Sequence, residues 1–449
     1  MRKKQSFGGN MSQLVKAFSK MIIPFTYQDF TIFEVINKDN PKPMFVENAF
    51  ALNHLLKSVH LKLGSGLSSI GKSYKLAAEA RQKVKLPKNT NGKIELITRT
   101  KDEINFIITI ENVYLHLFET KVGFLEFEFF YGANQYQDIF TINYFLSEIK
   151  SKSNKLRFRI NRSKNEYDEI TTSIQEICCL VLQGNDSIKY YKETNDRSNF
   201  DFKPMLFSHM LLSSKPDNIE RMLELGANVY KESYKNTQQL INYLHPFENS
   251  YWNITFNGAI NISYLLEDSI TDVFFENTFY SNVQQQYFYL FLLALHQRFS
   301  MIHQIVEMNK ISINRLSDSA SILRAKKHID GFIEKMAFFE ARAYFTNVSS
   351  ITQISNYFSK MQQNFLIKDL HLELNQKISS MKLISAKYYN AYQLNVQKQI
   401  ETKRISDKIH QLRVQIFVNI ITQIIGGLSI FKLIWDVSLI ISGGAVKQE

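Results

Sequence analysis

The chain contains few of the residues that cross-link a fold or interrupt it. Among its 449 residues are two cysteines, 16 glycines and seven prolines. Cys178 and Cys179 are adjacent and cannot build a disulfide framework, so a reducing compartment is expected. Scarce glycine and proline exclude a fold made of many tight turns and favour long helices over an all-β architecture. The N-terminal residues carry positive charge without an apolar core, which argues against a secretory signal.

Residues with the spacing of a catalytic or metal site are also lacking. The ten histidines are dispersed and the two cysteines are adjacent, so no zinc-ligand spacing exists. No nucleophile–histidine–acid arrangement can be drawn from the spacing either, and we expect no enzyme, no metal and no cofactor. Glu126 and Glu128 alternate on one expected strand and could bind a cation, but salt-bridged or solvated side chains are the favoured interpretation.

The strongest positive signal is a long apolar segment from Val414 to Ser442. It exceeds the roughly 20 residues that a helix needs to cross a bilayer. On a helix of about 100° per residue, its polar residues share one face, namely Gln415, Asn419, Thr422, Gln423, Gly426 and Ser429. Such a stripe suits a helix that packs against copies of itself or lines a pore, so Asn419, Gln423 and Gly426 are the pore-lining candidates. A buried helix of a soluble bundle and a helix lying in the membrane surface are the alternatives.

The net charge of +12 predicts an orientation for this segment. A basic run from Lys398 to Arg413 precedes it, and Lys447 follows. By the positive-inside tendency, the N-terminal side faces the cytoplasm. We therefore expect the chain in the cell (inner) membrane, in contact with lipid, with most of it cytoplasmic.

A second basic group belongs to an expected strand at residues 155–162. Arg157 and Arg159 alternate with apolar residues, and Arg162 closes the strand. These three arginines are anion-binding candidates, for a nucleotide messenger or an anionic lipid, with a solvated basic face as the alternative. Interleaved exposed aromatic residues are lacking, so no specific nucleic acid is predicted.

The hydrophobic pattern predicts an α+β fold. Alternation favours strands within residues 104–118 and 121–131, and helical spacing follows within 139–149. Helices are expected to dominate from about Phe202, and residues 364–413 form a stalk helix that continues into the apolar segment. The expected divisions are an N-terminal α/β domain at 1–200, a mixed and mainly helical domain at 201–310, a helical stalk at 311–413 and a transmembrane helix at 414–442.

A phosphate-loop pattern, G-x-x-x-x-G-K-[ST], is met by Gly66, Gly71, Lys72 and Ser73. In such loops backbone N–H groups wrap a phosphate, the lysine adds charge and the serine holds Mg²⁺. The loop needs a buried strand before it, and Val59 to Leu63 alternates as a half-exposed strand would. A helix from Tyr74 to Arg81 is expected after it. We favour a flexible basic loop over a nucleotide site.

Several segments in order resemble divergent CorA-like proteins of prokaryotes. They are residues 70–87, 113–131, 138–150, 252–265, 287–303 and 341–350, followed by the stalk and the apolar segment. Transporting CorA proteins are similar in layout, with a cytoplasmic α/β domain, a long stalk helix that continues into a pore-lining span, and a homopentameric assembly. Their Gly-Met-Asn signature is absent here, where Gly443, Gly444 and Ala445 stand nearby, so no filter residue is carried over.

The resemblance implies a membrane-anchored, homo-oligomeric CorA-like channel or pore-forming protein, with a pentamer as the implied assembly. Some CorA-like proteins of this divergent kind look like anti-phage defence effectors whose cytoplasmic domain senses a nucleotide signal, and that role is an expectation by analogy. Two alternatives remain. One is a soluble or peripheral P-loop nucleotide-binding protein, and the other is a non-enzymatic helical scaffold.

Overall fold

A computed structural model describes most of the chain. The described residues are 12–27, 44–60, 62–64, 69–86, 94–97, 107–131, 135–148, 155–163, 166–182, 188–189, 204–229, 243–309 and 319–443. The chain divides into two units, one of residues 1–311 with 331–378 and the other of residues 312–330 with 379–449. Within the described residues, the first unit is a sheet with helices and the second is helical.

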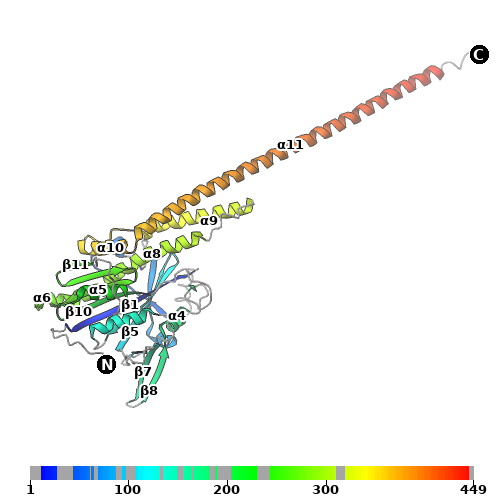
Figure 1. Ribbon diagram of the computed structural model, residues 1–449. Helices are drawn as coiled ribbons and strands as arrows, with labels where there is room; N and C mark the ends of the chain where they lie inside the picture. Colours follow the sequence, from blue (N-terminus) through cyan, green and yellow to red (C-terminus); the bar gives the residue numbers. More distant parts are fainter. Residues whose placement is uncertain are drawn as a thin grey trace, which may run out of the picture. The chain divides into compact units, whose positions relative to one another are not determined.

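A mixed sheet forms the centre of the first unit (Figure 1). Its main path runs β11-β12-β13-β10-β1-β6-β5-β4-β7-β8, with β2, β3 and β9 pairing off this path. The strands are β1 Leu14–Tyr27, β2 Phe45–Glu47, β3 Gly71–Leu76, β4 Ile94–Ile97, β5 Ile107–Phe118, β6 Val122–Tyr131, β7 Lys155–Ser163, β8 Glu166–Thr172, β9 Ile188–Lys189, β10 Met205–Leu212, β11 Leu244–Phe247, β12 Ser250–Thr255 and β13 Gly258–Tyr264. β10 and β13 are parallel, whereas β1 is antiparallel to both β6 and β10.

The helical elements are α2 Lys57–His60, the 3₁₀ helix η1 Ala78–Val84, α3 Tyr136–Ser147, α4 Ile174–Leu182, α5 Ile219–Asn228, α6 Ser269–Val273, the π-helix η2 Phe274–Phe279, α7 Tyr280–Asn282, the π-helix η3 Val283–Tyr287, α8 Phe288–Asn309, α9 Ser319–Phe338, the π-helix η5 Phe339–Ala343, α10 Thr352–Asn364 and α11 Ile367–Gly443. Successive side chains of a strand point to opposite faces of the sheet. Both sets are buried here, so both faces of the sheet are covered, and helices provide that cover.

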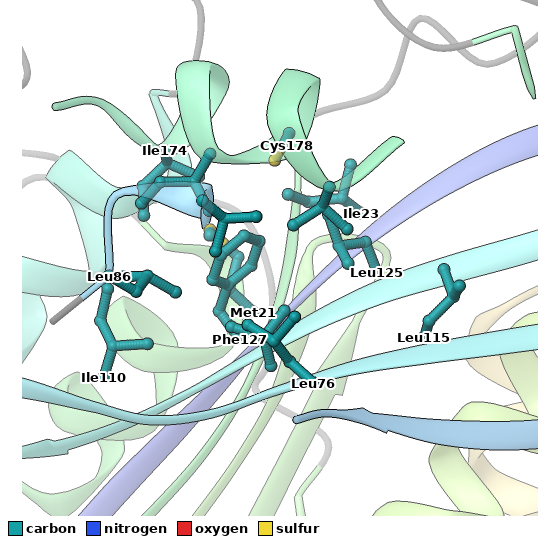
Figure 2. Close-up of a cluster of buried hydrophobic side chains, with 14 of the residues drawn as sticks. Met21, Ile23, Leu76, Leu86, Ile110, Leu115, Leu125, Phe127, Ile174 and Cys178 are labelled. Atoms are coloured by element: carbon teal, nitrogen blue, oxygen red, sulfur yellow. The ribbon is translucent and has the colours of Figure 1, made fainter. Parts of the chain in front are cut away.

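One face of the sheet packs against α4 and η1. Met21 of β1 and Phe127 of β6 belong to the same buried cluster as Ile174 and Cys178 of α4 (Figure 2). The long apolar alternation of β5 and β6 supplies much of this cluster. The strands and the helix expected between residues 104 and 162 are confirmed as β5, β6, α3 and β7.

Residues 205–264 differ from the expectation that helices dominate after Phe202. Four strands, β10 to β13, lie in this range and join the N-terminal sheet through the β1–β10 pairing. The expected division at residue 200 therefore falls within one sheet. α5 packs on β13, and a Cβ atom at Gly226 would lie 2.2 Å from Cδ1 of Ile260.

α11 is a single helix that contains both the stalk and the apolar segment. No proline interrupts it, and glycine first appears at Gly426. Its continuity confirms the prediction that stalk and apolar segment form one rod. Within the second unit, Nζ of Lys326 in α9 lies 5.3 Å from the ring centroid of Tyr389 in α11.

Candidate functional site

The apolar part of α11 is exposed throughout its described length. It is long and apolar enough to cross a membrane, and none of its most apolar stretch is buried within the chain. Phe417, Phe431 and Trp435 are 64%, 70% and 64% exposed. A core helix of a soluble bundle would be largely buried, whereas none of the residues that the structure describes covers this surface. The structure thus favours a membrane anchor among the expected alternatives.

The polar stripe of this segment has two kinds of side chain. The hydroxyls of Thr422 and Ser429 donate to backbone carbonyls one turn earlier, those of Val418 and Ile425. These hydroxyls are satisfied by their own helix, as is common in membrane helices. The candidates Asn419, Gln423 and Gly426 remain at the surface of α11, and a Cβ atom at Gly426 would meet nothing within 4 Å.

A buried ionic cluster lies inside the sheet, on the face that α8 covers. Lys20 of β1 donates to Glu126 of β6, with 2.8 Å between Nζ and Oε1, and its Nζ is 3.3 Å from Oε1 of Glu128. Nε2 of His116, in β5, is 2.7 Å from Oε2 of Glu126. All four side chains are at most 3% exposed. The interpretation of Glu126 and Glu128 as salt-bridged is confirmed.

Two further side chains donate hydrogen bonds to the carboxylate of Glu128. Nδ2 of Asn112 donates to Oε2 of Glu128 over 2.6 Å, and Nε2 of Gln284 in η3 donates to Oε1 over 2.9 Å. Nζ of Lys20 also lies 4.1 Å from the ring centroid of Phe288, at the start of α8. The π-helical turn and the start of α8 therefore close the cluster from solvent.

The charges in this cluster stabilise one another. Burial alone would lower the pKa of Lys20, but the charges of Glu126 and Glu128 raise it above its ordinary value. Burial likewise opposes ionisation of Glu128, yet Lys20 and the hydrogen bonds from Asn112 and Gln284 bring its pKa below the ordinary value. Lys20 and Glu128 are both charged at neutral pH, so the cluster acts as a buried internal pairing.

Two further buried histidines are neutral. Burial lowers the pKa of His296 to about 3 and that of His209 to about 4. Nε2 of His296 is 2.8 Å from the hydroxyl of Thr120, and its ring stacks on Phe118 with 3.9 Å between centroids. Nδ1 of His209 is 2.8 Å from Oδ1 of Asn261. Among the described residues no group of three or more histidine, cysteine or acidic side chains could hold a metal ion.

The phosphate-loop pattern falls on a strand. Gly71, Lys72 and Ser73 begin β3, which pairs antiparallel with β5, and a Cβ atom at Gly71 would lie 2.3 Å from the carbonyl oxygen of Leu117. Gly71 is therefore required for close strand packing. The helix expected from Tyr74 to Arg81 is wrong for its first residues, because β3 continues to Leu76 and a 3₁₀ helix begins at Ala78. A phosphate loop needs its lysine and serine at a helix N-terminus, so this geometry does not support a nucleotide site. Gly66 lies outside the described residues.

The arginines expected to bind an anion lie on β7. In register, Arg157 is opposite Glu95 of β4 and Thr171 of β8, and Arg159 is opposite Glu169. Arg162 also belongs to β7. The side chains of these three arginines lie outside the described part of the structure, so the anion site stays a prediction.

Sequence reasoning missed Lys20 and His116. Each stands in a run of apolar residues whose alternation places it on a buried face, and a charged residue in such a position needs a partner. That signal was readable in the sequence, although the identity of the partners was not. No family model, curated protein or solved structure matches this chain.

Proposed function

We propose that this chain is a membrane-anchored, self-assembling protein whose C-terminal helix crosses the bilayer and lines a pore. The observation that carries the proposal is the apolar part of α11, which is exposed over its whole described length. A surface of this size is unstable in water and stable in hydrocarbon. The helix satisfies its own backbone hydrogen bonds, as a spanning segment must.

Self-assembly is supported by the amide side chains of the stripe. Asn419 and Gln423 are exposed on a helix whose neighbouring residues are apolar. In a bilayer these amides are stabilised by hydrogen bonds to an adjacent helix or by water in a pore, and Gly426 allows helices to approach closely.

Ion conduction and its control rest on the resemblance to CorA-like proteins. On that analogy the first unit is cytoplasmic and a ligand bound there gates the pore, as in an anti-phage effector. The basic residues between Lys398 and Arg413 favour the cytoplasmic placement.

Truncation tests the anchor. A chain that ends at Leu412 should move from the membrane pellet to the supernatant, because the exposed apolar surface is removed. The full chain should stay in the pellet after carbonate extraction, which releases peripheral proteins. Full chain in the carbonate supernatant, or truncated chain still in the pellet, would contradict the proposal.

A further inference from the structure

α11 carries a line of large apolar side chains that repeats every eleven residues. Leu383, Leu394, Ile405 and Ile416 are 73%, 59%, 59% and 57% exposed. At about 100° per residue, eleven residues advance about 20° beyond three full turns, so the four side chains follow one nearly straight line. Successive members are about 16.5 Å apart, since a helix rises about 1.5 Å per residue.

The roughly opposite side of this part of α11 already has a partner within the chain. Tyr388, Tyr392 and Val396 are half-buried, and Lys326 of α9 lies over the ring of Tyr389. The large apolar side chains left exposed between residues 383 and 405 are Leu383, Leu394 and Ile405 of the line and, off the line, Ile400.

The line continues directly into the polar stripe of the apolar segment. Asn419 is 36 residues after Leu383, and 36 residues make about ten full turns of an α-helix. Gln423 is 18 residues after Ile405, which makes about five turns. One side of a single helix therefore carries the four apolar side chains, the last of them Ile416 inside the apolar segment, followed by the amides of Asn419 and Gln423.

We propose that the line of Leu383, Leu394, Ile405 and Ile416 is the contact between parallel, in-register copies of this chain. A partner must offer apolar side chains at the same spacing, and a second copy does so at every position. Copies anchored by the same C-terminal segment enter the bilayer in one direction, which makes them parallel. In this respect the inference rests on the proposed function. An eleven-residue repeat predicts a slightly right-handed winding of the helices.

Charge distinguishes a second copy from an anionic partner. Between the first and last members of the line stand Lys387, Lys398, Lys403, Arg404, Lys408 and Arg413 against two acids, Glu401 and Asp407, so each copy contributes a net charge of +4 (six minus two). Identical copies repel through these basic residues, and salt should strengthen their contact by screening. A lipid or protein of negative charge would bind there more weakly as salt rises.

Cysteine cross-linking in membranes tests the contact. The full chain would carry Cys179→Ser together with Leu394→Cys, Ile405→Cys or Lys403→Cys, while Cys178 stays buried in the core. Lys403 is the matched control, because it is exposed and two residues from Ile405, about 160° around the helix. Under mild oxidation, Leu394→Cys and Ile405→Cys should form covalent dimers at least tenfold faster than Lys403→Cys, and faster still at high salt.

Three results would overturn the inference. They are equal rates at the three positions, faster linking between Leu394→Cys and Ile405→Cys chains than within either kind, and dimers that form more slowly as salt rises. Membrane fractionation of the same samples separates this inference from the anchor. Chains that stay in the carbonate pellet but link at Lys403→Cys would sink the contact and leave the anchor standing. Chains that carbonate releases but that link at Ile405→Cys would contradict the anchor and leave the contact standing.

Discussion

The ammonium group of Lys20 holds two buried carboxylates, those of Glu126 and Glu128. Removing one partner of a buried ion pair leaves an uncompensated charge in the interior, which typically costs about 3–5 kcal/mol. Lys20→Met should therefore lower the urea midpoint of the first unit substantially. Tryptophan fluorescence of the solubilised full chain would report it, because Trp252 is buried in this unit.

Lys83→Met is the matched control for this change, since Lys83 is exposed on η1 and should have little effect. The triple variant Lys20→Met, Glu126→Gln and Glu128→Gln should recover part of the loss, because no unpaired charge remains. Equal midpoints for Lys20→Met and Lys83→Met would show that the cluster contributes no net stability.

At this scale the sequence predicted the state of the carboxylates but not their partner. The alternation around Glu126 and Glu128 placed both on one face of a strand, and the structure confirms a salt bridge. Lys20 precedes Glu126 by 106 residues, and the β1–β6 register brings them together. A register between distant strands depends on the whole sheet and cannot be read from local pattern.

Among the helices, two glycines predict opposite outcomes for the same substitution. Replacing glycine by alanine inside a helix normally stabilises it by about 0.5–1 kcal/mol. At Gly331 in α9 a Cβ atom would meet nothing within 4 Å, so Gly331→Ala should be neutral or stabilising. At Gly226 in α5 it would meet Ile260, so Gly226→Ala should destabilise by about 1–3 kcal/mol through overpacking against β13.

Thermal unfolding of both variants measures the difference. Gly226→Ala combined with Ile260→Val should recover part of the loss, because valine lacks the Cδ1 atom at 2.2 Å. A Gly226→Ala chain as stable as Gly331→Ala would mean that α5 shifts away from the sheet at no cost.

The elements that sequence reasoning found are those with strong periodicity, and the ones it missed have identifiable causes. β12 and β13 form a hairpin around Phe256 and Asn257, and the Asn257-Gly258 pair is a hairpin signal that was available. β3 is different, because its residues match a phosphate-loop pattern. Its pairing with β2 and β5 makes it a strand, and tertiary context overrides the motif there.

On the proposed function, the polar stripe is the face of the apolar segment that lines the pore. Asn419→Leu with Gln423→Leu should abolish ion flux through the protein in planar bilayers while membrane insertion is kept, because the segment becomes more apolar. Phe417→Leu with Ile421→Leu is the matched control and should leave flux near its original level. Flux that survives the amide changes but is lost with the control would place the pore on the opposite face.

The sequence identified the long apolar helix and its polar side because both depend on local composition and helical spacing. Which side of the stalk helix stays exposed was not readable from the sequence, since it depends on where α9 packs. The residues opposite the arginines of β7 were not readable from local pattern either. The strand register alone places acidic residues there.

The position of β1 in the sheet also sets the order in which this protein folds. β1 is the first described strand, yet it pairs with β10, and its Ser19 hydroxyl bonds to that of Ser208, 189 residues later. Closing so long a loop makes the sheet centre slow to form, whereas each hydrogen bond of α11 joins residues four apart and forms quickly. A full-length chain released from denaturant should therefore form α11 before the sheet is complete. During that interval the long strands β1, β5 and β6 are exposed to mispairing, so the chain should depend on chaperones during synthesis.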